Sequence, residues 1–239
     1  MPVVAAAICP HPPLLLPSVA SGAASELDDL RIACTTAVDR VFAAHPDVVV
    51  ILGAGAISGH FGPGDFGSFD RFGVRETYAL GGVDALAVGD RLPLSLAVAA
   101  WLLRDRPTTP PRRGFAIAAD ADAETCWKAG RDLDAEPDRV ALIVMGDGTA
   151  CRGDKSPGYD DPRAEAFDAS VAAAFAAADV DALLAIDVEV AAQLLVAGRA
   201  PWQVLAGATG AGWRGEVLYD AAPYGVSYVV ASWRPALAS

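Results

Sequence analysis

Several residue types and patterns are scarce in this 239-residue chain, and each scarcity narrows what the protein can be. There are two lysines and no asparagine, and the 18 basic residues are outnumbered by 30 acidic ones, for a net charge of −12. Such a chain repels a phosphate backbone, which argues against nucleic acid as a partner. No apolar run is long enough for a membrane span, and the first residues lack the basic stretch of a signal peptide. We therefore expect no membrane partner and a cytoplasmic location, in a bacterium, because Ala, Arg, Gly and Pro are used heavily.

Cysteine is also sparse, and its four positions are scattered. Cys9, Cys34, Cys126 and Cys151 form no CxxC pair and no dense framework, which is typical of reduced thiols in a cytoplasm. Hydrophobic residues make up 53% of the chain and charged residues only 20%, so a sizeable core can form and disorder is excluded. No repeat or linker divides the sequence. We expect one α/β domain over residues 1–239.

Apolar runs and helical periodicity alternate along the chain. Val3–Cys9 and residues 48–52 are short apolar runs that predict buried strands, and apolar residues recur between them at helical spacing. Ser25 stands where the N-cap of that helix is expected. This βαβ unit predicts a mainly parallel central sheet flanked by helices. Further helices are expected at 92–103, 167–178, 188–196 and 202–206, and further strands at 115–119, 140–145, 217–219 and 226–233.

Two glycine-rich segments approach phosphate-binding motifs without meeting their requirements. Residues 53–59 follow a strand, but they continue into His60-Phe-Gly-Pro-Gly, which cannot open the helix that a bound pyrophosphate needs. Residues 148–156 nearly spell a P-loop, but Asp154 places a carboxylate where phosphate should lie. The sequence thus disfavours a nucleotide cofactor, and we interpret the long segment 53–73 as a functional or mobile loop.

His11 is the site residue that the local sequence singles out. It lies among three prolines directly after the first strand, at the end of the strand where α/β folds bind ligands. The alternative is a rigid polyproline turn with an incidental imidazole, and the local sequence leaves both open. His45 closes a helix and suits a structural role. His60 lies in the glycine-rich segment, either on the surface or in a lid over a pocket.

A series of short strings extends over nearly the whole chain. They are Cys-Pro-His-Pro-Pro-Leu-Leu-Leu-Pro (9–17), Pro-Asp-Val-Val-Val-Ile-Leu (46–52), Gly-Asp-Phe-Gly (64–67) with Arg-Phe-Gly (71–73), Ile-Val-Met-Gly-Asp (143–147), Pro-Gly-Tyr-Asp-Asp-Pro (157–162) with Phe-Asp (167–168), and the segment 217–228. In this order the strings resemble the catalytic-subunit family of class III extradiol ring-cleavage dioxygenases, which includes the Memo-like proteins. The resemblance implies that family's α/β fold.

The resemblance also implies a metal site, and here the chain departs from the family. Ring-cleaving relatives hold non-haem iron(II) with two histidines and a carboxylate, and a further histidine acts as acid–base. His11 matches the first histidine, and Asp220 matches the carboxylate with one methylene fewer. Gly55 stands at the second histidine, and Ala150 replaces the histidine that ends the family's Gly-Asp-Leu-Ser-His motif, whose aspartate is Asp147. One imidazole and one short carboxylate are too few ligands for a stable iron centre.

Two nearby side chains are candidates to complete a rearranged site. His60, five residues past the missing second histidine, would swing in from the glycine-rich segment. Cys151, next to Ala150, would supply a thiolate and favour zinc or copper over iron. The candidate residues are therefore His11 and Asp147 for catalysis, His11, Asp220 and His60 for metal, and Pro12, Gly55, Ala150 and Cys151 as pocket lining.

Three functions stay open from the sequence. The first is a divergent ring-cleavage dioxygenase, or related oxidoreductase, with a lost or rearranged metal site. The second is a metal-free protein that binds a small aromatic or acidic metabolite, or that does acid–base chemistry with His11 and Asp147. The third is a scaffold protein on the same fold. We expect no tightly bound cofactor, with iron(II) or zinc in a rearranged site as the alternative, and the resemblance implies a homodimer.

Overall fold

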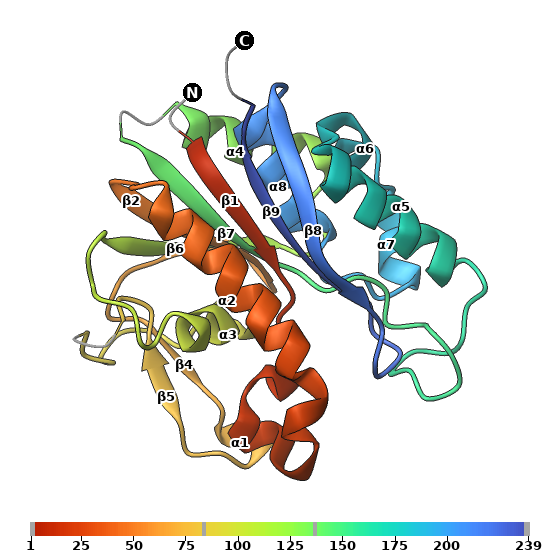
Figure 1. Ribbon diagram of the computed structural model, residues 1–239, viewed down its shortest axis with the longest axis horizontal. Helices are drawn as coiled ribbons and strands as arrows, with labels where there is room; N and C mark the ends of the chain where they lie inside the picture. The colour runs from red at the N-terminus through yellow and green to blue at the C-terminus, as the bar shows by residue number, and fades with distance from the viewer. Residues whose placement is uncertain (1–2, 83–84, 136–137, 237–239) are drawn as a thin grey trace.

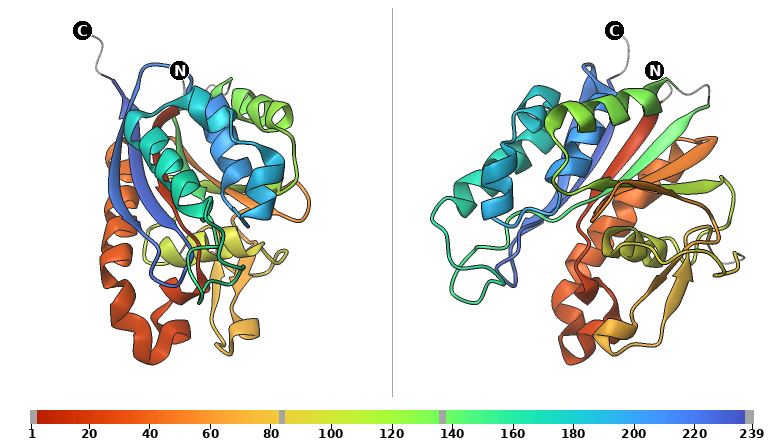
Figure 2. Two further views of the ribbon diagram at one scale, coloured as in Figure 1. Left: turned by 90° about the vertical axis from the view of Figure 1, so that its right-hand side faces the viewer. Right: turned by 180° about the vertical axis from the view of Figure 1, so that it is seen from behind.

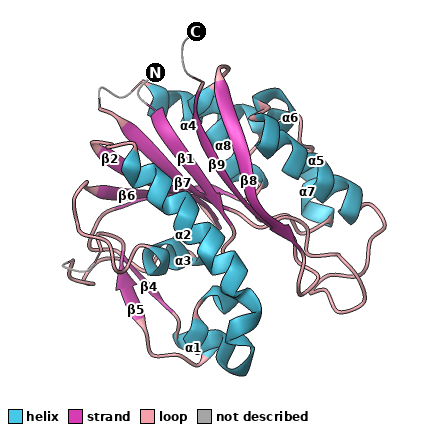
Figure 3. Ribbon diagram, viewed as in Figure 1, coloured by secondary structure: helices cyan, strands magenta, loops and turns pink. Residues whose placement is uncertain are grey.

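A seven-stranded sheet forms the centre of the computed structural model, which describes residues 3–82, 85–135 and 138–236 (Figures 1 and 3). The strand order is β3-β6-β2-β7-β1-β9-β8. The strands are β1 (Val3–Cys9), β2 (Val48–Gly55), β3 (Gly59–Phe61), β6 (Arg112–Ala118), β7 (Val140–Met145), β8 (Trp213–Ala221) and β9 (Tyr228–Pro235). A separate two-stranded sheet pairs β4 (Phe66–Ser68) with β5 (Thr77–Ala79).

The four inner strands β6, β2, β7 and β1 run parallel, as the sequence predicts for a mainly parallel sheet. Strands β1, β2 and β7 are strongly apolar, and all six residues of β7 are buried, because helices cover both faces of a parallel sheet. The outer strands β3 and β9 pair antiparallel with β6 and β1, and β8 pairs antiparallel with β9. The chain is thus α/β, with a mostly parallel central sheet flanked by helices.

Helices cover the two faces of the sheet, which Figure 2 shows from the side and from behind. One face packs against α2 (Asp28–Ala43) and α3 (Leu94–Leu102), and the other against α4 (Ala123–Asp134), α5 (Ala164–Ala177), α6 (Val180–Leu184) and α8 (Arg199–Thr209). The short α7 (Val188–Gln193) packs instead in a small separate cluster with Cys151 and Leu194. Alternation along β1 divides its side chains between these faces: Ala5, Ala7 and Cys9 join the α2 side, while Ala6 and Ile8 join the α8 side. Among the described residues, no helix has the length and apolar character needed to cross a membrane.

The first long helix begins differently from the expectation. A short α1 (Pro17–Ala20) and a 3₁₀ segment, η2 (Ser21–Leu27), run directly into α2, so Leu27 occupies the N-cap position and makes no side-chain cap. Ser25 lies inside η2, where its carbonyl accepts the N–H of Asp28, and the prediction that it caps the helix is wrong. The 3₁₀ turns already pair backbone groups at this end, which makes a side-chain cap dispensable.

The glycine-rich segment 53–73 is more structured than the expected loop. It holds the end of β2, the edge strand β3, β4 and a 3₁₀ turn, η3 (Asp70–Phe72). Gly67 shows why small residues occur here, because a Cβ at this position would collide with Ala97 of α3. The interpretation of 53–73 as one long loop is therefore wrong. Glycines in it serve close packing as well as turning.

Candidate functional site

His11 and Asp147 meet at the carboxyl end of the central strands. Cys9 pairs with Met145 across the parallel β1–β7 ladder, and the N–H of Gly146 donates to the carbonyl of Cys9 at 2.9 Å. Two residues beyond each strand, the backbone N–H of His11 donates to Asp147 Oδ1 at 2.7 Å. The two strands thus end side by side and bring together an imidazole and a carboxylate that are 136 residues apart in sequence.

The His11 side chain is enclosed and incompletely bonded. The residue is 7% exposed, and its Nδ1 is buried without a hydrogen-bond partner among the described residues. Asp147 Oδ1 lies 3.6 Å from Nδ1, slightly beyond hydrogen-bond range. The Asp147 side chain is 15% exposed, so the pair lies at the edge of solvent. A buried polar atom without a partner costs free energy, which makes this nitrogen a candidate functional group.

Tyr228, the first residue of β9, is a further titratable group in this neighbourhood. It is buried, and burial raises the pKa of its hydroxyl well above the usual value, with the negative charge of Asp147 as the next cause. Tyr228 is therefore neutral over the physiological range. Its ring belongs to the apolar cluster on the α2 side of the sheet.

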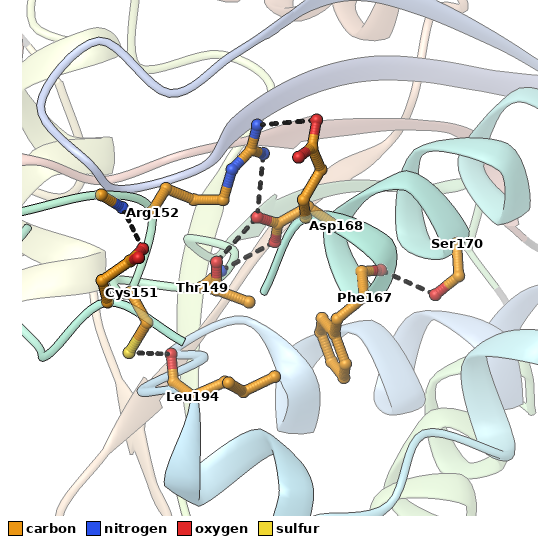
Figure 4. A network of polar contacts seen from close by, with 10 residues as sticks. Thr149, Cys151, Arg152, Phe167, Asp168, Ser170 and Leu194 are labelled. Carbon is orange, nitrogen blue, oxygen red and sulfur yellow. Dashed lines mark hydrogen bonds and ion pairs between the residues drawn. The ribbon is translucent and has the colours of Figure 1, made fainter. Parts of the chain in front are cut away.

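The loop after β7 is anchored by a buried carboxylate (Figure 4). Asp168 of α5 accepts the N–H of Thr149 at 2.9 Å and its hydroxyl at 2.7 Å, and Arg152 Nη1 lies 3.4 Å from the same carboxylate. On the other side, Gly148 N–H donates to Ser227 O and Ser227 N–H donates to Thr149 O, both at 2.8 Å. Burial raises the pKa of Asp168, and the bonds from Thr149 oppose that rise. These contacts fix the backbone that carries Asp147.

Cys151 faces the far side of this loop. The residue is 3% exposed, and its thiol donates to the carbonyl of Leu194 at 3.6 Å, as Figure 4 shows. Burial raises the pKa of the thiol, and the charges of Asp161 and Asp168 add to the rise. Ala150 is half-buried and donates its N–H to the same Leu194 carbonyl at 3.0 Å. The local environment therefore disfavours the thiolate that metal binding requires.

The other expected pocket residues are distributed along the same end of the sheet. Pro12 is buried, and its carbonyl accepts the N–H of Leu15 in the 3₁₀ turn η1 (Pro13–Leu15). Gly55 ends β2, opposite Ala118 of β6. Asp220 lies near the end of β8, opposite Val229, and is exposed. Since β8 is two strands away from β1, about 10 Å of lateral spacing separates the strands that carry Asp220 and His11.

His60 lies far from this end of β1. It is exposed on the edge strand β3, where it pairs with Phe115 of β6 and stacks on its ring at 4.9 Å between centroids. Four strand spacings separate β3 from β1, which is about 19 Å. The structure therefore does not bring His60 to His11.

The side chains present do not fit an iron(II) centre of the family's kind. Metal ligands lie about 2.0–2.3 Å from the ion, so three donors must converge within a few ångströms. Among the described residues, no three His, Cys, Asp or Glu side chains form such a group. Asp147 already accepts a backbone N–H, Asp220 is exposed two strands away, and Cys151 bonds to Leu194.

Several residues that shape this site received no role from the sequence. Thr149 lies in the loop that carries Asp147, and Asp168, Ser227 and Tyr228 lie around this loop. Ser227 Oγ is buried without a partner among the described residues. Phe-Asp (167–168) and the segment 217–228 stood in the strings that carried the family resemblance. The strings thus included these segments, but nothing in the sequence predicted that Asp168 would accept hydrogen bonds from Thr149.

Comparison with known proteins adds no family name. No family model matches the chain, and no curated protein matches it. A solved structure of an uncharacterized protein from Escherichia coli K12 aligns over 97% of this chain and 99% of its own, with 14% identity and a TM-score of 0.47. That protein's name states no ligand and no activity.

Proposed function

We propose that this protein is a divergent relative of the class III extradiol dioxygenases that no longer uses their iron chemistry. In this proposal it binds a small hydroxylated aromatic metabolite at the carboxyl end of β1 and β7, and His11 exchanges a proton with the ligand's hydroxyl. The observation that carries the proposal is the enclosed His11–Asp147 pair, with a Nδ1–Oδ1 distance of 3.6 Å and no bonded partner on Nδ1 among the described residues.

The pair has the parts of an acid–base dyad. A neutral imidazole with Nδ1–H directed at Asp147 presents Nε2 as the base, and a shift of a few tenths of an ångström makes the Nδ1–H···Oδ1 hydrogen bond. A hydroxyl that reaches Nε2 transfers its proton there, and the carboxylate of Asp147 stabilises the resulting imidazolium. The return of the proton to the ligand regenerates the neutral ring.

The surroundings favour a neutral hydroxyl over an acidic group on the ligand. Asp147 places a negative charge beside the imidazole, and the chain carries −12 overall, so a carboxylate ligand would be repelled. Because His11 is only 7% exposed, contact with it is restricted to one edge of a small molecule. A phenolic edge satisfies both conditions. From the sequence we expected an aromatic or acidic metabolite. The proposal now restricts the ligand to a phenol.

Binding of catechol and substituted phenols tests this function. We expect saturable binding that weakens at least tenfold in His11→Ala and clearly in Asp147→Asn, measured by calorimetry and by imidazole NMR shifts. His60→Ala is the matched control, because it removes an exposed imidazole about 19 Å away by strand spacing. Equal affinity in the wild type and His11→Ala would contradict the proposal.

An iron titration separates this proposal from a surviving dioxygenase. We expect no stoichiometric binding of iron(II) under anaerobic conditions, because the described metal-binding side chains do not converge around His11. For the same reason, we expect catechol and dioxygen to give no yellow ring-opened product. One equivalent of tightly held iron, with turnover abolished in His11→Ala, would overturn the metal-free function.

A further inference from the structure

A second candidate site lies at the opposite end of the sheet, where the amino end of β1, the carboxyl end of β9 and the start of β8 lie side by side near the top of Figure 1. A groove of about 650 Å³ opens there between the carboxyl end of α2 and the sheet. Its walls include Arg40, Arg214 and Arg234, together with Glu216 and Ser232. The volume is in the range of small-molecule sites, which is about 300–1,000 Å³.

Two of these arginines face each other across neighbouring strands. Arg214 of β8 is directly opposite Arg234 of β9, and both are exposed. Directly opposed side chains have Cβ atoms about 4.5–5.5 Å apart, and like charges at this spacing destabilise a sheet. Such a pair is unexpected in a chain with only 18 basic residues against 30 acidic ones. An anion between the two guanidinium groups would turn the repulsion into attraction.

Glu216, the acidic residue in the groove wall, already forms an ion pair with the third arginine, Arg40. Glu216 accepts from Arg40 with both oxygens, at 2.8 and 3.2 Å. Arg40 lowers the pKa of Glu216, with a smaller contribution from Arg234. Arg40 also lies in the last turn of α2, where the helix dipole adds negative charge. The positive charges of Arg214 and Arg234 are therefore in excess over the one negative charge of Glu216.

A hydroxyl and an apolar wall complete the groove. Ser232 is two residues before Arg234 on the same strand, so both side chains share a face, and no described residue forms a hydrogen bond with its hydroxyl. Val4 and Ala5 of β1 supply apolar lining beside these polar groups. Planar guanidinium groups with a hydroxyl match the oxygens of a phosphate group, which Arg binds in a bidentate manner.

We propose that this groove binds a small organic phosphate, with the phosphate between Arg214 and Arg234 and an apolar portion against β1. The site is independent of the proposed proton exchange at His11. Ala5 and His11 are six positions apart along β1 and its extension, which is about 20 Å. Variants at one site therefore test only the proposal for that site.

The test uses phenyl phosphate and inorganic phosphate as probes, with sodium chloride at matched ionic strength. We expect both phosphates to raise the melting temperature of the full chain above the chloride reference, and phenyl phosphate to bind more tightly. Arg214→Gln and Arg234→Gln should each weaken binding at least tenfold by calorimetry. Without phosphate, the same variants should melt no lower than the wild type, because each removes a like-charge repulsion.

Two controls fix the interpretation. Arg75→Gln removes an exposed arginine elsewhere and should leave the affinity within about twofold, and His11→Ala should do the same. Equal phosphate affinity in the wild type and both groove variants would overturn the proposal. So would phosphate stabilisation no larger than that of chloride. Equal binding of phenyl phosphate and inorganic phosphate would overturn the apolar part of the site.

Discussion

At the scale of single residues, Asp168 holds the most consequential buried charge near the candidate site. The side chain is 3% exposed and bonds to both the N–H and the hydroxyl of Thr149. Burial is the main cause of its raised pKa. A raised carboxyl pKa means that the folded state holds the proton more tightly than the unfolded state, whose pKa is near 3.8. The contribution of this group to stability is therefore complete below pH 3.8 and is lost as pH rises through the folded pKa.

Asp168→Asn tests this linkage. Asparagine keeps an acceptor for the Thr149 N–H, and the Thr149 hydroxyl can turn to accept from the amide. We expect the variant to gain stability relative to the wild type as pH rises from about 3.8 toward 7, measured by urea unfolding. Asp161→Asn is a control of opposite sign, because the hydrogen bond from Arg163 lowers the pKa of Asp161 to about 2. If Asp168→Asn instead lost stability relative to the wild type as pH rises, the contacts of Asp168 with Thr149 and Arg152 would outweigh the effect of burial on its pKa.

The cysteines allow a second prediction at this scale. All four thiols are buried. The hydrogen bond with Cys9, followed by burial, raises the pKa of Cys34, and burial is the main cause of the raised pKa values of Cys126 and Cys151. Thiolates are the reactive form, so we expect Ellman's reagent to label no cysteine of the native protein within minutes and all four in urea. Cys151→Ser identifies the source of any fast phase. Rapid native labelling that disappears in this variant would restore the thiolate role of Cys151.

At the scale of elements, α4 and α8 approach each other through glycines. A Cβ on Gly130 would meet the backbone of Val204 and Ala208, and one on Gly207 would meet the backbone of Trp127. We expect Gly130→Ala to lower the free energy of unfolding by about 1–3 kcal/mol, because backbone atoms cannot yield as a flexible side chain does. Gly22→Ala is the matched control, since no atom lies within 4 Å of the added methyl. Equal chemical-denaturation midpoints for the two variants would contradict this account of the packing.

Elements differ in how well the sequence predicts them, and the reason is burial. The strands Val3–Cys9 and Val140–Met145 have the predicted bounds, because both are apolar runs enclosed on two faces. Helix α4 was missed, since its buried residues are only Cys126, Gly130 and Leu133 and its sequence is largely polar. The short strands β3, β4 and β5 have three residues each, too few to show an alternation.

At the scale of the whole molecule, the sequence could predict those parts of the candidate site that follow from parallel strands ending at one edge of the sheet. His11 and Asp147 follow apolar strands, and parallel neighbours end at one edge of the sheet, so their approach follows from the fold. His60 was misjudged because the sequence does not show that its segment turns back as an antiparallel edge strand beyond β6. The groove of Arg214 and Arg234 was missed because cross-strand pairing depends on a register that composition does not reveal.

The position of β1 has a consequence for the order in which the chain is synthesised. Its first partner, β7, pairs Val140 with Val3, and its second, β9, pairs Trp233 with Ala6, so the partners follow 137 and 227 positions later. A nascent chain on the ribosome therefore carries an apolar strand without either neighbour while more than half of the protein is made. Exposed strand edges recruit other strands, and distant pairings form slowly. A chaperone that shields the first ten residues would therefore matter most before β7 emerges, and a chain terminated before Tyr228 would keep one edge of β1 open to aggregation.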